Sequence, residues 1–82
     1  MKLSPAKITR FTEGKFLIQI VETDTEFESW LGHNDYGIFD FMFALPKKQP
    51  DGEMTAEEFL KVVRKALPNF KKEFEAEHID EI

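Results

Sequence analysis

The spacing of apolar residues changes once along the chain, and this change most limits what the chain can fold into. Up to residue 46, short apolar stretches alternate with turn-forming residues, which is typical of consecutive β-strands. After residue 55, apolar side chains recur at helical spacing, at Phe59, Val62, Val63, Ala66 and Phe70. Strands followed by a helix predict a two-layer α+β domain, in which a sheet forms one layer and a helix forms the other.

The size of the chain predicts a single domain. With 82 residues, only a modest core can form, so we expect residues 1–82 to fold as one small globular unit. A composition of 41% hydrophobic and 33% charged residues is typical of soluble globular proteins. The chain has no cysteine, which excludes disulfide frameworks and thiolate chemistry. Without a long apolar run or the apolar core of a signal peptide, a cytoplasmic location is expected.

The first predicted hairpin joins residues 6–11 and 15–22. Between them, Thr12, Glu13 and Gly14 predict a type I turn with the glycine as a bulge at positive φ. In the second of these strands, alternate residues would share a face of the sheet.

A second hairpin is predicted around an aromatic-rich strand at 38–45, which follows turn-forming residues. Residues 23–31 fit either a strand or a short helix, and the strand is favoured because it supplies the other arm of this hairpin. Four consecutive strands with short connections predict an antiparallel meander.

A capping box at Thr55 and Glu58 predicts that a helix begins at Ala56. Pro68 lacks an amide hydrogen and disfavours the helical conformation of the residue before it, so a break is expected near Pro68, with helix resuming over 69–78. The predicted fold is therefore a four-stranded antiparallel β-meander packed on a C-terminal helix (ββββα or ββββαα).

The net charge of −5 is unevenly distributed. Residues 22–46 carry six carboxylates and no lysine or arginine, whereas the helix carries a basic face that we expect to be solvated. An acidic total makes direct binding to nucleic acid or to an anionic membrane unexpected.

No catalytic constellation is visible. Ser29, His33 and either Asp35 or Asp40 are the residue types of a triad, but nothing in the sequence positions them relative to one another. His33 is expected at a solvated hairpin tip, and His78 in a frayed terminus that would hold a metal only weakly. We therefore expect no enzymatic activity, no cofactor and no metal site.

The sequence carries more apolar residues than one buried sheet face needs. Strict alternation predicts that Phe39, Phe41, Phe43 and Leu45 face the helix, with Phe41 buried at the centre. The predicted interaction surface on the other face comprises Leu17, Val21, Trp30, Ile38, Asp40 and Met42. Two alternatives stay open for this face: the chain after Pro68 covers it with Phe70, Phe74 and Ile79, or another molecule does.

The function predicted from these features is that of a small, non-enzymatic protein-interaction module whose partner is another protein or a second copy. Its binding surface would be the second sheet face and the acidic hairpin of residues 22–36. The alternative is an acidic charge mimic that inhibits a nucleic-acid-handling enzyme, based on the carboxylates of 22–46.

Overall fold

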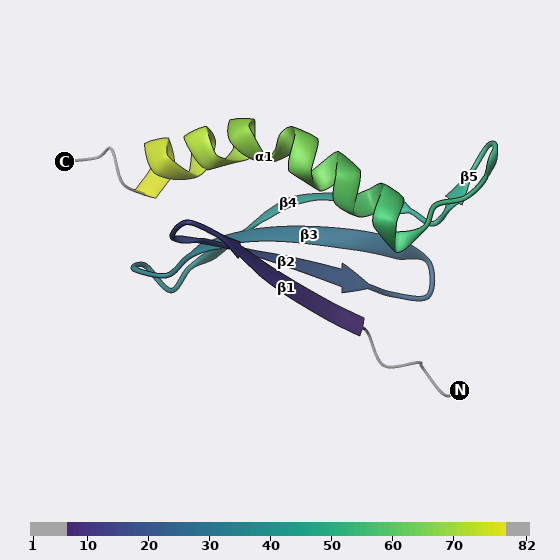
Figure 1. Ribbon diagram of the computed structural model, residues 1–82, viewed down its shortest axis with the longest axis horizontal. Helices are drawn as coiled ribbons and strands as arrows, with labels where there is room; N and C mark the ends of the chain where they lie inside the picture. The colour runs from purple at the N-terminus through teal and green to yellow at the C-terminus, as the bar shows by residue number, and fades with distance from the viewer. Residues whose placement is uncertain (1–6, 79–82) are drawn as a thin grey trace.

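The protein folds as a four-stranded antiparallel sheet with a helix along one face (Figure 1). The computed structural model describes residues 7–78. The sheet has the order β1-β2-β3-β4 and is formed by β1 (Lys7–Glu13), β2 (Phe16–Glu22), β3 (Glu26–His33) and β4 (Phe39–Pro46). A short hairpin of β5 (Lys48–Gln49) and β6 (Gly52–Glu53) leads into α1 (Ala56–His78). The predicted meander and C-terminal helix are confirmed, and residues 23–31 lie mainly in a strand.

Short connections hold the meander together. Glu13 pairs with Phe16, which leaves only Gly14 and Lys15 in the first turn, with Gly14 at a φ of 61°. A two-residue loop with glycine first is the type II′ pattern, so the expected type I turn with a bulge is wrong.

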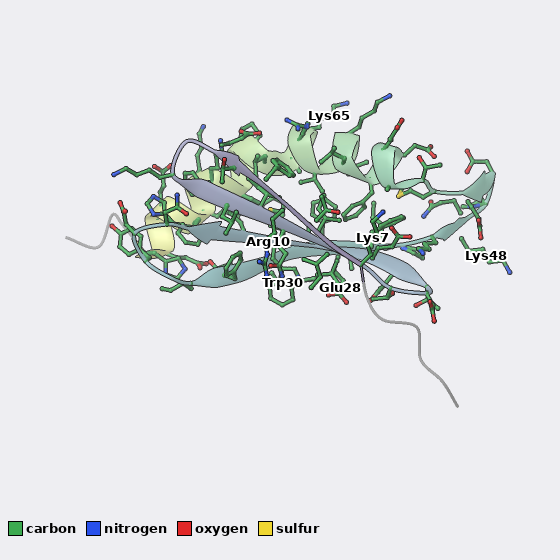
Figure 2. The ribbon with its side chains drawn as sticks, turned by 60° about the horizontal axis from the view of Figure 1, so that its bottom comes forward. Lys7, Arg10, Glu28, Trp30, Lys48 and Lys65 are labelled. Atoms are coloured by element: carbon green, nitrogen blue, oxygen red, sulfur yellow. The ribbon has the colours of Figure 1, made fainter. Side chains whose placement is uncertain are left out.

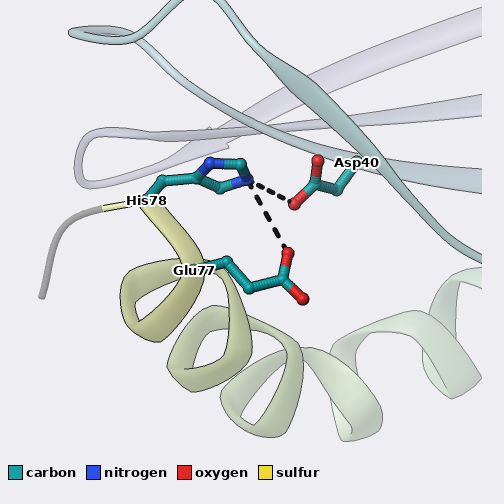
Figure 3. A group of neighbouring side chains, drawn as sticks. All are labelled: Asp40, Glu77 and His78. Atoms are coloured by element: carbon teal, nitrogen blue, oxygen red, sulfur yellow. Dashed lines mark hydrogen bonds and ion pairs between the residues drawn. The ribbon is translucent and has the colours of Figure 1, made fainter. Parts of the chain in front are cut away.

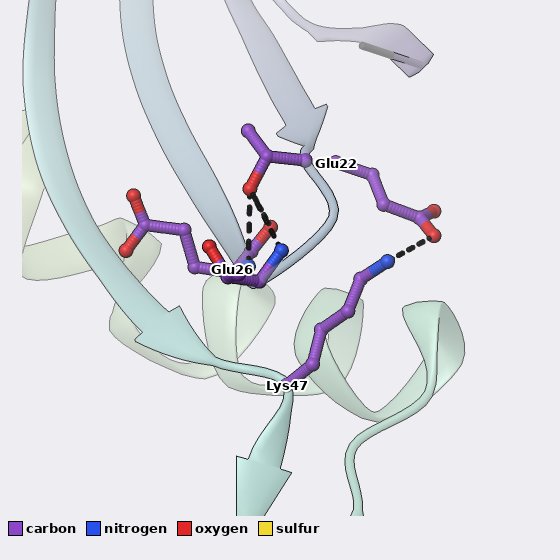
Figure 4. A network of polar contacts seen from close by, with 5 residues as sticks. Glu22, Glu26 and Lys47 are labelled. Carbon is purple, nitrogen blue, oxygen red and sulfur yellow. Dashed lines mark hydrogen bonds and ion pairs between the residues drawn. The ribbon is translucent and has the colours of Figure 1, made fainter. Parts of the chain in front are cut away.

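The turn between β2 and β3 is fastened to the chain after β4 (Figure 4). The Oγ1 of Thr23 accepts hydrogen bonds from the backbone N–H groups of Thr25 and Glu26. The backbone N–H of Lys47 donates to the carbonyl of Thr25, and its Nζ pairs with Glu22 at 2.9 Å. These contacts tie the end of β4 to the β2–β3 turn.

Helix α1 begins where the capping box places it. The hydroxyl of Thr55 accepts from the N–H of Glu58, and the Glu58 carboxylate accepts from the N–H of Thr55 at 3.0 Å. The backbone hydrogen bond from Thr55, followed by that from its hydroxyl, lowers the pKa of Glu58. The break expected near Pro68 is not confirmed, because one helix runs from Ala56 to His78 with Pro68 inside it.

The core lies between α1 and the face of the sheet that α1 covers. Phe27 of β3 stacks on Phe59 of α1, with ring centroids 5.1 Å apart. The buried apolar side chains are Ile18, Ile20, Phe27, Leu31 and Met42 of the sheet with Phe59, Val63, Leu67 and Phe74 of the helix. Both halves of the helix, on either side of Pro68, therefore contribute to one core.

A β-bulge in β4 changes which of its side chains face the helix. Ser29 pairs with Phe43 but the next residue, Trp30, pairs with Phe41, so Met42 is an extra residue on β4. The buried Ser29 hydroxyl donates to the carbonyl of Phe43 at 2.9 Å and accepts from its N–H at 3.3 Å. This side chain therefore supplies hydrogen bonds where the regular ladder is interrupted.

The bulge overturns part of the predicted alternation. Phe43 and Leu45 pack against the core as predicted. Phe41 is 51% exposed, so its predicted burial is wrong, and Phe39 is exposed as well. Met42, predicted on the second face, is instead buried in the core. The pleat reverses across the bulge, and a pattern of strict alternation cannot show this.

Ion pairs join the basic helix to the sheet. Glu13, at the end of β1, lies 2.8 Å from Lys71 and 3.7 Å from Arg64. Part of the helix's basic face is thereby neutralised by a strand carboxylate rather than left to solvent. Among residues 7–78, no helix has both the length and the apolar character needed to cross a membrane.

Candidate functional site

The first candidate surface is the face of the sheet that points away from α1, and we call it the open face. Side chains on β2 alternate, so that those between the buried Ile18 and Ile20 point away from the helix. The strand register then assigns the neighbouring side chains to the same face. The open face includes Ile8, Arg10, Thr12, Leu17, Gln19, Val21, Glu28, Trp30, Phe39, Phe41 and Ala44.

Aromatic side chains form the centre of the open face. Trp30 and Phe41 pack edge to face, with ring centroids 5.1 Å apart. The ring of Phe39 lies over Gly32, where an added Cβ would come within 2.8 Å of it. Phe41 and Phe39 are 51% and 41% exposed, so these rings are only partly covered by one another.

Two opposite charges flank the aromatic centre. Arg10 of β1 and Glu28 of β3 project from the same side of the sheet as Trp30, opposite to Lys65 on the helix (Figure 2). The Nε of Arg10 donates to Gln19 at 2.8 Å, and the Nε1 of Trp30 donates to Glu28 at 3.4 Å. Neither Arg10 nor Glu28 forms an ion pair within residues 7–78.

The chain after Pro68 does not cover the open face within the described residues. Phe74 packs edge to face on Phe16 at 5.7 Å, and Phe70 lies 5.9 Å from Phe43. Both therefore belong to the helix side of the sheet, and the alternative in which they fold over the second face is wrong. Ile79, the third residue of that alternative, lies outside the described residues.

The structure brings together only part of the predicted interaction surface. Leu17, Val21 and Trp30 lie on the open face, while Ile38 lies just before β4 and is 39% exposed. Asp40 lies with Met42 on the helix side, so the prediction that both face away from it is wrong.

Sequence analysis missed three large apolar residues of the open face, which are Ile8, Phe39 and Phe41. Ile8 is 52% exposed and pairs with Val21. The sequence did allow this residue to be placed, because paired residues on neighbouring strands point to the same face and Val21 was already assigned to it. The sequence did not allow the two phenylalanines to be placed, because their orientation depends on the bulge.

A second candidate site joins β4 to the last turn of α1 (Figure 3). The Nε2 of His78 lies 2.8 Å from the Oδ2 of Asp40 and 3.9 Å from the Oε2 of Glu77. One nitrogen or oxygen atom from each of the three side chains lies within 4.8 Å of the others. His78 is thus held by β4, contrary to the prediction that it lies in a frayed terminus.

A cavity of about 270 Å³ adjoins this group. Its acidic lining comes from Asp40, Glu73 and Glu77, and its apolar lining from Leu31, Phe41, Met42, Phe70 and Phe74. A cavity of this size holds several water molecules or a hydrated ion.

His33 has a structural role, and its predicted solvation is wrong. It is 8% exposed and packs edge to face on Phe16 at 5.0 Å. Its Nδ1 accepts the N–H of Asp35, while the hydroxyl of Ser29 is engaged with Phe43. The side chains named for a triad therefore do not bond to one another: His33 and Ser29 bond to backbone groups, Asp35 pairs with Lys15, and Asp40 pairs with His78.

Comparisons with protein-family models, with curated proteins and with solved structures give no match to this chain.

Proposed function

We propose that this protein is a small, non-enzymatic interaction module that self-associates as a symmetric dimer through its open face. The observation that carries the proposal is the pair of half-exposed phenylalanines, Phe39 and Phe41, beside Trp30 on a face that the helix leaves uncovered. Contiguous exposed apolar surface marks interaction sites, and aromatic side chains are enriched at their centres.

The charges on the open face favour a second copy as the partner. Arg10 of β1, Gln19 of β2 and Trp30 of β3 lie side by side across the sheet. Glu28 is two residues from Trp30 along β3 and points to the same face. Because β1 and β3 flank β2, a two-fold axis along β2 would stack β1 of each copy on β3 of the other. Arg10 of each copy would then lie over Trp30 and Glu28 of the other copy, so that the same contact forms twice. A surface that is complementary to itself in this way suits an isologous dimer.

Apolar side chains extend across the open face, as face-to-face packing of two sheets requires. Two sheets that pack face to face lie about 10 Å apart and interdigitate their side chains. Ile8, Leu17 and Val21 extend the apolar surface from the aromatic centre across β1 and β2. The result would be a two-sheet sandwich with a helix on each outer side.

The acidic hairpin of residues 22–36 would lie partly at the rim of this interface. Its carboxylates also support the alternative function, inhibition of a nucleic-acid-handling enzyme by charge mimicry. Two observations weigh against that alternative: Glu22 pairs with Lys47, and Asp35 pairs with Lys15. Paired carboxylates present less net negative charge to a basic groove.

Sedimentation equilibrium over a hundredfold range of protein concentration tests the proposal. We expect a monomer–dimer equilibrium that Phe41→Glu shifts strongly toward monomer, because the charge would be buried at the interface. Val62→Glu is the matched control, since Val62 is 38% exposed but lies on the helix. A strict monomer at every concentration would refute self-association.

A charge exchange tests the two-fold arrangement itself. Arg10→Glu and Glu28→Arg should each weaken the dimer, whereas the double variant should restore much of the loss. Failure of the double variant to recover would rule out this pairing. Association with a basic protein that weakens steeply with salt, in a chain that stays monomeric, would favour the charge mimic instead.

A further inference from the structure

We propose that Asp40, Glu77 and His78 form a binding site for a divalent transition-metal ion such as Zn²⁺, which fastens the C-terminal end of α1 to β4. This inference does not rest on the proposed dimer, because Asp40 and His78 meet on the helix side of the sheet. An imidazole nitrogen combined with two carboxylates is a donor set that suits zinc and its neighbours.

Two of the three spacings between the ligand atoms are close to those of a zinc site, and all three lie within 4.8 Å. Ligands of a tetrahedral zinc ion lie about 2.0–2.2 Å from the metal and thus about 3.4 Å from one another. The Nε2 of His78 lies 2.8 Å from Asp40 and 3.9 Å from Glu77 in the structure, which brackets that spacing. The side chain of Glu77 is 69% exposed and has room to move toward the other two.

The origin of the ligands favours a defined site over a chance surface group. Asp40 and His78 are 38 residues apart in sequence and come from different elements of the fold. Their side chains are 33% and 22% exposed, so neighbouring groups restrict both. Folding therefore already holds two of the ligands together, so that metal binding does not have to supply the conformational entropy cost of ordering them.

The electrostatics also favour a cation. Asp40, Glu73 and Glu77 border one cavity of about 270 Å³. Within residues 7–78, none of these three carboxylates forms an ion pair with a lysine or an arginine. The cavity provides room for the water molecules that complete the coordination of the ion, with Glu73 one helical turn from Glu77.

Calorimetric titration of the untagged chain with Zn²⁺ tests the site. We expect saturable binding of one ion per chain and a rise in the thermal midpoint of unfolding. His78→Gln and Asp40→Asn should each weaken binding by at least about tenfold, since even residues that only support a metal ligand contribute that much. Glu75→Gln is the control, because this exposed helix carboxylate does not border the cavity.

Two further measurements keep the test decisive. Glu77→Gln alters a mostly exposed side chain and should leave the metal-free fold intact while it weakens zinc binding. Mg²⁺, which prefers oxygen ligands, should bind much more weakly than Zn²⁺ and should not respond to His78→Gln. If His78→Gln binds zinc as tightly as the unmodified chain or the Glu75→Gln control, the proposal is overturned.

Discussion

Truncation of two adjacent residues, Phe41 and Met42, tests the bulge on which the open face depends. The larger side chain, Phe41, points away from the helix and is 51% exposed, whereas Met42 is 8% exposed in the core. A regular strand would reverse these positions. We therefore expect Met42→Ala to destabilise the fold more than Phe41→Ala, although phenylalanine is the larger residue.

The magnitudes follow from burial. Full burial of a large apolar side chain contributes about 1.5–3 kcal/mol, so the half-buried Phe41 contributes about 1 kcal/mol. Its edge contact with Trp30 adds about 0.5–1.5 kcal/mol, which gives about 1.5–2.5 kcal/mol for Phe41→Ala. Met42→Ala removes a buried side chain and leaves a cavity, which costs about 2–5 kcal/mol.

Urea denaturation followed by circular dichroism measures both differences in unfolding free energy. The protein concentration must be one at which sedimentation shows a monomer, because dimer formation would add stability that depends on Phe41. A loss of more than about 3 kcal/mol in Phe41→Ala, with little change in Met42→Ala, would show that β4 alternates without a bulge. The assignment of the open face would then be refuted with it.

Three further substitutions test local features, each by thermal or urea denaturation. Thr55→Ala should cost about 1 kcal/mol through loss of the helix cap. Because the folded-state pKa of Glu58 is lowered, the stability that its ionised carboxylate contributes should be complete at neutral pH and should disappear as the pH falls through that lowered value. Thr55→Ala should reduce this acid-dependent part without abolishing it, because the backbone N–H of residue 55 still donates to the Glu58 carboxylate. Ser29→Ala should cost about 1–3 kcal/mol, since it removes both hydrogen bonds that the hydroxyl makes to the backbone of Phe43. An unchanged midpoint would mean that the bulge does not need the hydroxyl. Gly32→Ala should cost about 1–3 kcal/mol by displacing the aromatic ring packed on it, and should change the near-ultraviolet dichroism.

Local sequence patterns were sufficient for the capping box and for most of the meander. Thr55 and Glu58 are three residues apart, so the hydrogen bonds between them depend only on nearby backbone. Residues 23–31 were ambiguous alone, because their local pattern fits a strand and a short helix. Pairing with β2 on one side and β4 on the other makes this segment a strand.

The continuity of α1 through Pro68 reflects packing on both sides of the proline. Leu67 is 1% exposed and Phe74 is 2% exposed, so each half of the helix is buried against the sheet. The local preference of proline concerns one turn of backbone, whereas this burial involves both halves of the helix. The local sequence pattern therefore shows the tendency of proline to break a helix, but it does not show the burial that keeps α1 continuous.

The sequence by itself determined the fold class, the order of the elements and the start of the helix, because each depends on periodicity or on contacts between near neighbours. Only the tertiary structure decided the two candidate sites. The bulge that turns Phe41 outward is bonded to Ser29 on another strand, 14 residues away. The contact between Asp40 and His78 likewise joins residues 38 apart, through the packing of helix on sheet. Contacts at such separations leave no repeat in the sequence, since they arise only when the elements pack together.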